Sequence, residues 1–518
     1  MNIIRKIKLL AVSSLAVLSM SSCNDWLNVS MEDKIMEKDL FSNYEGYLMA
    51  LNGVYMSMND VYARTLTTGE IDVMAQYYNV TENNNHRMKL FSSYSYSDVS
   101  FESQNYTLWS RMYTLLANLN AVIEHTDIDD APLTAQQFAV IRGEALGLRA
   151  FLHFDLLRLY GPIFSVNSTD ECIPYQNSTD REIQPLLPAD KVLDLIIKDL
   201  HEAEALLRDH DPILTEGTGN TATEDDGIAH YDMAFRQLRF NYYAVEALLA
   251  RAYHWKGDKA TAYDIAKHKI IDAITTEDLE VFPWATKNKV LQEGKPDYLL
   301  SSEVIFSLYN SKRSDIYSAN FAQTLRALTS RLTFYGSDMS GDSKIALFYD
   351  DDNDIRRNMW TVVEPTQGEL GDAGEEGEVA GNTLALNKFA PAAKDVEFDG
   401  TETYRFMMPL IRLSEIYLIA AETTSDNSEA LTLINTIRNK RECTNLPEDC
   451  DLGQAITFEM AREVIGEGQL FFFYKRRNAA QLISGTSAEP YNMVSTNYVW
   501  PIPKEELNKR VLVDNNQN

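Results

Sequence analysis

The chain has 518 residues, 45% of them hydrophobic, and carries 47 Lys and Arg against 76 Asp and Glu, a formal net charge of −29. This hydrophobic content is enough to bury a large core and excludes a wholly disordered chain. The acidic balance argues against nucleic-acid binding, which needs cations to displace the counterions of phosphates. It also disfavours a broad electrostatic grip on anionic lipid. Four cysteines are too few for a disulfide scaffold.

The N-terminal segment predicts the compartment. A basic stretch is followed by an apolar run from Leu9 to Met20, which is shorter than the about 20 residues of a membrane-spanning helix and is typical of a signal peptide. The run leads through small residues into Cys23, and this pattern resembles a bacterial lipoprotein signal, which implies lipidation of Cys23. We therefore expect a signal peptide at 1–22 and a lipidated leader at 23–40; an ordinary secretory signal with an incidental cysteine is the alternative.

Helical periodicity dominates the remainder, 41–518, which we predict to be a single, mostly α-helical body. Apolar residues recur every three or four positions, as in amphipathic helices. Thr134 followed by Gln137 is a capping-box pattern, and Gly161-Pro162 is a helix end. The predicted helices span 42–59, 104–125, 135–160, 188–207, 239–256, 258–273, 410–424, 426–442 and 457–474.

The stretch 275–405 differs from the helical parts around it. It contains a short strand-like run at 304–309 and loops rich in Gly, Asp and Glu near 368–381. We interpret it as an irregular insert with short strands, followed by a C-terminal helical part at 406–518. Loops on a rigid helical frame often carry binding residues, so the insert is expected to contribute to a ligand-binding side.

Two segments have the spacing of tetratricopeptide units. Ala250, Tyr253, Gly257 and Ala262 follow the order small residue, aromatic, turn glycine, small residue. A weaker unit spans 413–441. Small residues allow paired helices to approach closely, and the aromatic fills the space toward the next pair. The sequence therefore predicts helical pairs without fixing their number.

Several segments together resemble the SusD/RagB-like outer-membrane lipoproteins, and they occur in that family's order. They are the lipidation site at 23–27, EALGLRAFLHFDLLRLYGPIF at 144–164, the repeat unit at 248–271, RLSEIYLIAAE with ALTLINTIRNKR at 412–441, and EVIGEGQLFFFYKRRN with WPIPKEEL at 463–507.

The resemblance implies both architecture and function. It implies a mostly helical body with four tetratricopeptide-like pairs on one side and irregular loops on the other. It also implies a lipid-anchored protein on the exterior of the outer membrane. Such a protein captures nutrient, usually an oligosaccharide, and delivers it as a lid to a SusC-like TonB-dependent transporter. No catalytic activity and no cofactor are implied.

Sugar sites combine flat aromatic rings with a few polar groups that bind hydroxyls. Two clusters, one in a predicted loop and one in the insert, have this composition, although for any single residue plain packing is the commoner role of such a side chain. The first cluster is Tyr77, Tyr78, Asn83, Arg87, Tyr94 and Tyr96. The second, in the insert, is Trp284, Tyr309, Tyr335 and Trp360.

Cysteine and acidic motifs give weaker signals. Cys443 and Cys450 flank a polar turn, and the sequence leaves open whether they form a disulfide or stay free thiols. The run 350–354 places aspartates at the first positions of a calcium loop, but it lacks the glycine and the glutamate that such a loop needs. We expect an acidic surface turn and no metal site there. Cys172 is expected to be buried.

Catalytic motifs are missing from the sequence. It contains no nucleophile elbow, phosphate loop, dinucleotide fingerprint or zinc-protease motif. Three functions remain: a surface lipoprotein that binds oligosaccharides, the same architecture binding peptides, and a helical-repeat adaptor without a small ligand.

Overall fold

The computed structural model describes residues 37–80, 85–128, 131–180, 182–218, 233–327, 329–334, 348–365, 382–392, 403–484 and 489–517. The predicted signal peptide and the lipidation site Cys23 lie outside the described residues, as do the predicted ligand residues Asn83 and Tyr335.

Long antiparallel helices form the N-terminal part, as predicted. Helix α3 (Tyr44–Val61) packs against α6 (Val99–Thr126), α6 against α7 (Ala135–Tyr160), and α7 against α9 (Ala189–Leu207). The predicted capping box is present at the start of α7. Almost every residue of α7 beyond its first turn is buried, so this helix is the centre of the N-terminal part. The mostly α-helical architecture is confirmed.

The two predicted repeat units are helical pairs. In the first, α11 (Tyr242–Lys256) turns at Gly257, whose φ of +87° is a left-handed conformation, into α12 (Lys259–Asp264) and a π-helical continuation at Ile265–Ile271. In the second, α17 (Leu413–Thr423) packs against α18 (Asn427–Lys440). Contacts of α11 with α9 and with α17 join the pairs into one stack.

The C-terminal part corrects one predicted helix. The expected helix at 457–474 is two helices, α19 (Leu452–Glu463) and α20 (Leu470–Arg476). Between them Gly466 and Gly468 have φ values of +78° and +71°, which a continuous right-handed helix cannot contain. Beyond α20, helix α21 (Lys504–Gln517) contacts α6.

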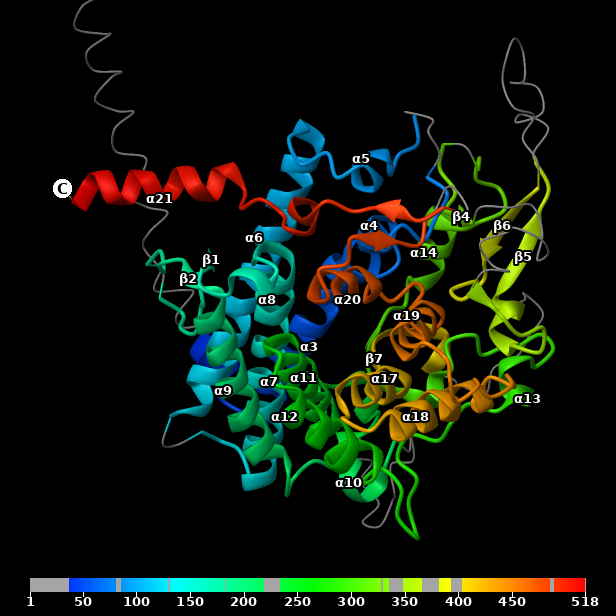
Figure 1. The fold of residues 1–518 in the computed structure, drawn as a ribbon. Helices are drawn as coiled ribbons and strands as arrows, with labels where there is room; N and C mark the ends of the chain where they lie inside the picture. The colour runs from blue at the N-terminus through cyan, green and yellow to red at the C-terminus, as the bar shows by residue number, and fades with distance from the viewer. Residues whose placement is uncertain are drawn as a thin grey trace, which may run out of the picture.

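The insert contains short antiparallel sheets. The predicted strand at 304–309 is β3 (Val304–Tyr309), and it pairs with β7 (Met407–Arg412), which had been predicted in part as the start of a helix at 410–424. A second sheet has the order β4 (Thr333–Phe334), β6 (Thr383–Leu386), β5 (Trp360–Val363). In Figure 1 this sheet lies on the opposite side of the molecule from α9.

Short elements complete the fold. The strand pairs are β1 (Glu171–Ile173) with β2 (Leu187–Pro188) and β8 (Gln481–Leu482) with β9 (Tyr491–Asn492). The short helices are α4 (Glu70–Met74), α5 (Lys89–Ser92), α8 (Phe164–Asn167), α10 (Ile213–Glu216), α13 (Lys287–Val290) and α14 (Arg313–Asn320).

One large apolar core runs from α3 to the segment before α21 and includes the β3–β7 pair. Within the described ranges, no helix has both the length and the apolar character that crossing a bilayer requires.

Candidate functional site

The structure places the first predicted aromatic cluster inside the core. Tyr77, Tyr78 and Tyr94 are 1%, 2% and 6% exposed. The Tyr77 hydroxyl donates to the carbonyl oxygen of Ala461 at 2.7 Å, and that of Tyr94 to the carbonyl oxygen of Met74 at 2.6 Å. These rings present no face to a ligand in this structure, because segments distant in the sequence close over them.

The two other described members of this cluster also make structural contacts. Tyr96 is half-buried and its hydroxyl donates to the carbonyl oxygen of Asn497. Arg87 is exposed, but its guanidinium donates to Asn320 Oδ1 at 2.7 Å and to the carbonyl oxygens of Ala319 and Ser330 at 2.9 and 3.0 Å. Arg87 therefore connects its loop to the C-terminal end of α14 (Arg313–Asn320) and to Ser330.

The described residues of the second cluster separate into packing residues and one exposed ring. Trp360 is 7% exposed, and its ring centre lies 4.0 Å from that of Phe334. Trp284 is half-buried, and its ring forms an edge-to-face pair with that of Tyr417. Tyr309 is 48% exposed. Of the predicted rings that the structure describes, Tyr309 is thus the one best placed for a ligand.

Tyr309 lies beside a cavity of about 350 Å³ on the insert side. Its ring centre is 5.0 Å from that of Phe406, which lines the cavity. Both rings are positioned by the β3–β7 pair, in which Tyr309 is opposite Met407. The lining side chains that a sugar could use are Lys295, Asp297, Tyr298, Arg313, Asn387, Phe389, Tyr404, Arg405 and Phe406.

The aromatic part of the cavity is amphipathic. Tyr298, Tyr404 and Phe406 are each half-buried, so part of each side chain reaches solvent. The Arg405 guanidinium lies 5.3 Å from the centre of the Phe406 ring. Rings with partly exposed surface next to charged groups are the combination that packs against the C–H faces of sugars while polar groups bind hydroxyls.

Charged groups in the cavity wall supply both donors and acceptors. Arg313 Nη1 donates to the carbonyl oxygen of Tyr404 at 2.6 Å, which holds this part of the wall. Burial lowers the pKa of Arg313 to about 10, with Asp297 opposing the shift, so the guanidinium stays charged at neutral pH. Asp297 Oδ2 accepts from Ser301, whereas Oδ1 has no hydrogen-bond partner in the described part of the chain.

A buried network of ion pairs adjoins the cavity through Lys388. Lys388, in the cavity wall, donates to Glu467 Oε1 at 2.6 Å, and Arg412 at the end of β7 donates to the same oxygen at 2.7 Å. Arg441 Nη2 reaches Glu303 Oε2, just before β3, at 2.7 Å and Glu463 Oε2 at 2.9 Å. The network thereby joins both strands beside the cavity to helices α18 and α19.

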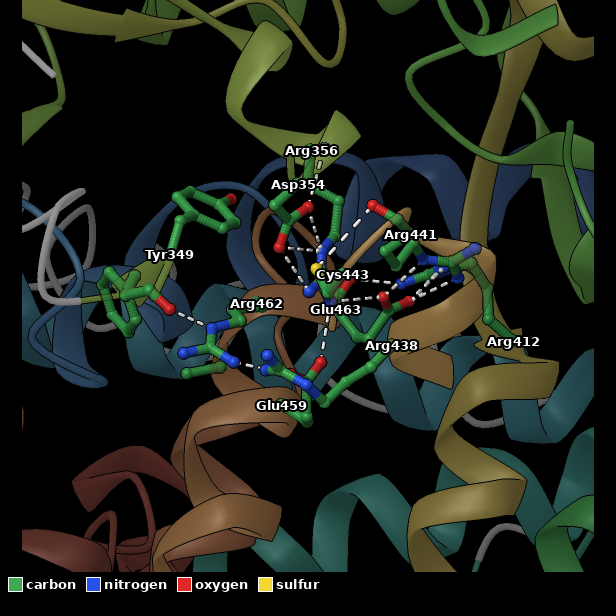
Figure 2. Close-up of polar contacts among 12 residues, drawn as sticks. Tyr349, Asp354, Arg356, Arg412, Arg438, Arg441, Cys443, Glu459, Arg462 and Glu463 are labelled. Atoms are coloured by element: carbon green, nitrogen blue, oxygen red, sulfur yellow. Dashed lines mark hydrogen bonds and ion pairs between the residues drawn. The ribbon is translucent and has the colours of Figure 1, made fainter. Parts of the chain in front are cut away.

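Figure 2 shows the centre of this network, where guanidinium groups surround the carboxylates of Glu459 and Glu463. Burial opposes the ionisation of Glu459, but Arg356 and Arg462 outweigh it and lower its pKa to about 2. Glu459 and Glu463 are both fully shielded from solvent. A carboxylate that is ionised, paired and shielded cannot exchange protons with a substrate, so the network is structural.

The predicted acidic surface turn at 350–354 is only partly a surface feature. Asp354 is 1% exposed and pairs with Arg356 at 2.6 Å, and Asp351 accepts from the Thr444 amide at 2.8 Å. Asp352, by contrast, is 95% exposed. These aspartates thus attach their loop to α18 and to the network. Across the described residues, no three His, Cys, Asp or Glu side chains are grouped to hold a metal ion.

The cysteines of the described structure are free thiols. Cys443 is buried and Cys450 is half-buried, and no bond joins them. The disulfide that the sequence left open is therefore absent from this structure. Cys172 is 2% exposed, as expected.

Sequence reasoning missed most of the cavity wall. Tyr404, Arg405 and Phe406 lie just before β7, and Tyr298 lies before β3. Their signal is the alternation of aromatic and basic residues immediately next to a strand, outside the long loops in which sugar-binding residues were expected. Pairing of β3 with β7 brings these two segments together.

Two family models match separate parts of the chain. A model described as "Starch-binding associating with outer membrane" matches residues 25–221, and one described as "SusD family" matches residues 308–518. The SusD-like protein P38 of Formosa agariphila is 27% identical over 206 residues, which are 39% of this chain and 38% of that protein. This chain thus matches less than half of that relative's length.

Solved structures share the fold over most of the chain. A SusD superfamily protein of Bacteroides thetaiotaomicron has a TM-score of 0.65 and 19% identity, with 90% of this chain and 98% of that chain covered. A laminarin-binding SusD-like protein has a TM-score of 0.56 and 18% identity, with 90% and 96% covered. At these identities the likeness concerns the fold.

Proposed function

The chain belongs to the SusD/RagB-like family, and from this premise we propose that it binds nutrient oligosaccharides at the cavity between the β3 and β7 segments. The observation that carries the proposal is the group of partly exposed rings, Tyr298, Tyr404 and Phe406, beside the exposed ring of Tyr309. A solved structure with this fold is a laminarin-binding protein, which supports a glycan as the ligand class.

The chemistry of the cavity suits a neutral sugar. Hydroxyl groups both donate and accept, and the wall offers Arg313 and Arg405 as donors and Asp297 as an acceptor. The rings gain contact area with the apolar faces of pyranose units at little cost in side-chain entropy, because each is already held by packing. The cavity of about 350 Å³ is at the lower end of ligand-site volumes, which fits a short segment of a longer glycan.

Delivery and anchoring complete the proposal. We propose that Cys23 is acylated, that the protein faces the cell exterior, and that it passes its glycan as a lid to a SusC-like TonB-dependent transporter without catalysis. Support comes from the signal sequence before Cys23 and from family models described as outer-membrane-associated and as SusD.

Calorimetric titration of the mature protein with a panel of oligosaccharides and a panel of peptides tests the ligand class. We expect a glycan to bind, and Tyr309→Ala to weaken its binding about fivefold, since an aromatic contact contributes on the order of 1 kcal/mol. Phe406→Ala removes the ring against which Tyr309 packs and is expected to have a larger effect.

Tyr106→Ala is the matched control. Tyr106 is a half-buried tyrosine on α6 that lines a different surface groove, so its loss should leave glycan binding unchanged. Binding of peptides in place of glycans, or equal weakening by the Tyr106 and Tyr309 substitutions, would contradict the proposal.

A further inference from the structure

Three buried nitrogen atoms without hydrogen-bond partners in the described structure belong to one face of α11. They are Arg251 Nη1, His254 Nε2 and Trp255 Nε1. Their side chains are 5%, 6% and 5% exposed. Positions three and four apart lie together on a helix, and all three residues line one cavity of about 50 Å³. Unpaired buried donors are costly, so this grouping points to an acceptor that the protein itself does not provide.

The other walls of the cavity come from distant parts of the chain. Helix α7 contributes Arg158, α17 contributes Glu415 and Glu422, and α20 contributes Arg476. In Figure 1 these helices meet α11 near the middle of the molecule. The cavity thus lies on the seam between the N-terminal helices and the C-terminal helices.

The carboxylates of Glu415 and Glu422 on this seam already accept hydrogen bonds from arginines. Arg251 donates through Nε and Nη2 to the two oxygens of Glu415, and its Nη1 has no hydrogen-bond partner in the described structure. Arg476 Nη2 donates to Glu422 Oε2 at 2.6 Å. His254 Nε2 is 3.6 Å from that oxygen, which is beyond hydrogen-bond distance. The three nitrogens of α11 are therefore left without a hydrogen bond to these carboxylates.

Cations lie near His254. Burial lowers the pKa of His254 to about 3, and the nearby cations Arg476, Lys259 and Arg477 add to this effect while Glu422 opposes it. The imidazole is consequently neutral at pH 7 and donates through Nε2 in the tautomer that carries its proton there. The cavity lining contains the guanidinium groups of Arg158, Arg251 and Arg476 as well as the carboxylates of Glu415 and Glu422. A neutral donor among more cations than carboxylates favours an anion as the acceptor.

We propose that this cavity binds one small monovalent anion, a halide or a short carboxylate, held by Arg251 Nη1, Trp255 Nε1 and His254 Nε2. An anion accepts from three donors without needing acceptors of its own, whereas a water molecule must also donate two hydrogen bonds. A water needs about 10–15 Å³, so a cavity of about 50 Å³ has room for a small anion with a water but not for a sugar ring.

The anion would satisfy the three unpaired donors of α11 inside the seam. Because it binds the folded chain, it should stabilise that chain with a saturable dependence on its concentration. This inference is independent of the glycan proposal, since the two cavities share no lining residue.

Thermal unfolding of the mature protein in increasing sodium bromide and in increasing sodium formate, with sodium sulfate at equal ionic strength as reference, tests the proposal. We expect the melting temperature to rise and saturate with bromide, with formate or with both, and this comparison distinguishes a halide from a carboxylate. A purely linear response to all three salts would overturn the proposal.

Trp255→Phe keeps the packing ring but removes the Nε1 donor, and is expected to raise the half-saturating anion concentration about tenfold, the effect of one lost hydrogen bond to a charged group. Trp109→Phe, at a buried tryptophan on α6 outside the cavity, should leave it unchanged. An equal response of both variants would refute the assigned donors.

A crystal of the unmodified chain grown in bromide gives a readout that needs no variant. We expect an anomalous peak within hydrogen-bond distance of Arg251 Nη1 and Trp255 Nε1. Ordered water alone at that position would overturn the proposal.

Discussion

At the scale of single residues, the buried Lys475 of α20 donates hydrogen bonds to the C-terminal end of another helix, α7. Its side chain is 0% exposed, and Nζ donates to the carbonyl oxygens of Arg158, Leu159 and Gly161 at 2.7, 3.3 and 2.7 Å. These carbonyls belong to the C-terminal end of α7, where no amide of the helix itself can pair with them. A cation there also complements the helix dipole.

The pKa of Lys475 makes this contribution dependent on pH. Burial lowers the pKa from 10.5 to about 7, with Cys172 opposing and Arg158 adding to the shift. Between these values the unfolded chain binds a proton that the native chain does not, so the stability contributed by Lys475 rises with pH. Below pH 7 both states are protonated, and the dependence disappears.

Replacing Lys475 by Met tests this interpretation. We expect the free energy of unfolding of the variant to be lower by about 2 kcal/mol or more at pH 7, because the carbonyl oxygens of Arg158 and Gly161 lose Lys475 as a donor. The carbonyl oxygen of Leu159 still accepts from the Trp500 amide. The difference in unfolding free energy from the unmodified protein should grow from pH 7 to about 10, measured by urea unfolding at each pH. Lys509→Met, at an exposed lysine on α21, should show neither effect, and a difference for Lys475→Met that stays constant with pH would contradict the assignment.

Single residues were also where the sequence was least informative about the site. Tyr77, Tyr78 and Tyr94 have the composition of a sugar-binding loop, yet they are core residues. Local composition cannot distinguish the two, because burial of Tyr77 depends on Ala461, a contact between residues far apart in the sequence. Tyr309, in contrast, was placed correctly on a strand, and its exposure follows from its position at the end of β3.

At the scale of elements, the break between α19 and α20 fixes how the C-terminal part meets the N-terminal part. The amides of Gly466 and Gly468 donate to the two oxygens of Asp72, on α4, at 2.6 and 3.1 Å. A Cβ on Gly468 would lie 1.9 Å from the carbonyl oxygen of Leu66. Glycine is therefore required here both by the left-handed backbone and by the close approach of another segment.

A pair of glycine substitutions separates these two requirements. Gly257→Ala, at a left-handed turn with open space around it, should cost about 1 kcal/mol of unfolding free energy from backbone strain alone. Gly468→Ala should cost about 3 kcal/mol or more, because overpacking against Leu66 adds to the strain. Denaturant unfolding of both variants measures the difference; equal costs would contradict the close approach.

Most elements could be predicted from periodicity and capping. Helix α7 and strand β3 were expected at their observed positions, because their signals are local. The division of 457–474 into α19 and α20 was not expected, because it depends on contacts with Asp72 and Leu66. Both residues are far from this segment in the sequence, so its local pattern does not reveal them. The predicted helix at 410–424 includes the last residues of strand β7 (Met407–Arg412), because an apolar run there is also compatible with a buried helical segment.

At the scale of the whole molecule, the stacked helices form a frame for the insert in which we propose the glycan site. The buried network joins α18 and α19 to the ends of β3 and β7 through Arg441, Glu303, Glu463 and Arg412. Because each of these charges is paired inside the core, loss of one partner would leave another unpaired and destabilise the frame. The β3–β7 pair is thus a rigid support for Tyr309 and Phe406.

The central claim is that this rigid support presents the cavity to a glycan. A crystal structure of the protein with the tightest-binding oligosaccharide of the panel tests it most directly. The account predicts sugar density against Tyr298, Tyr404 and Phe406, with hydroxyl groups within hydrogen-bond distance of Arg313 or Arg405. Sugar bound elsewhere, such as in the groove between α6 and α21, with this cavity unchanged and empty of ligand, would contradict it.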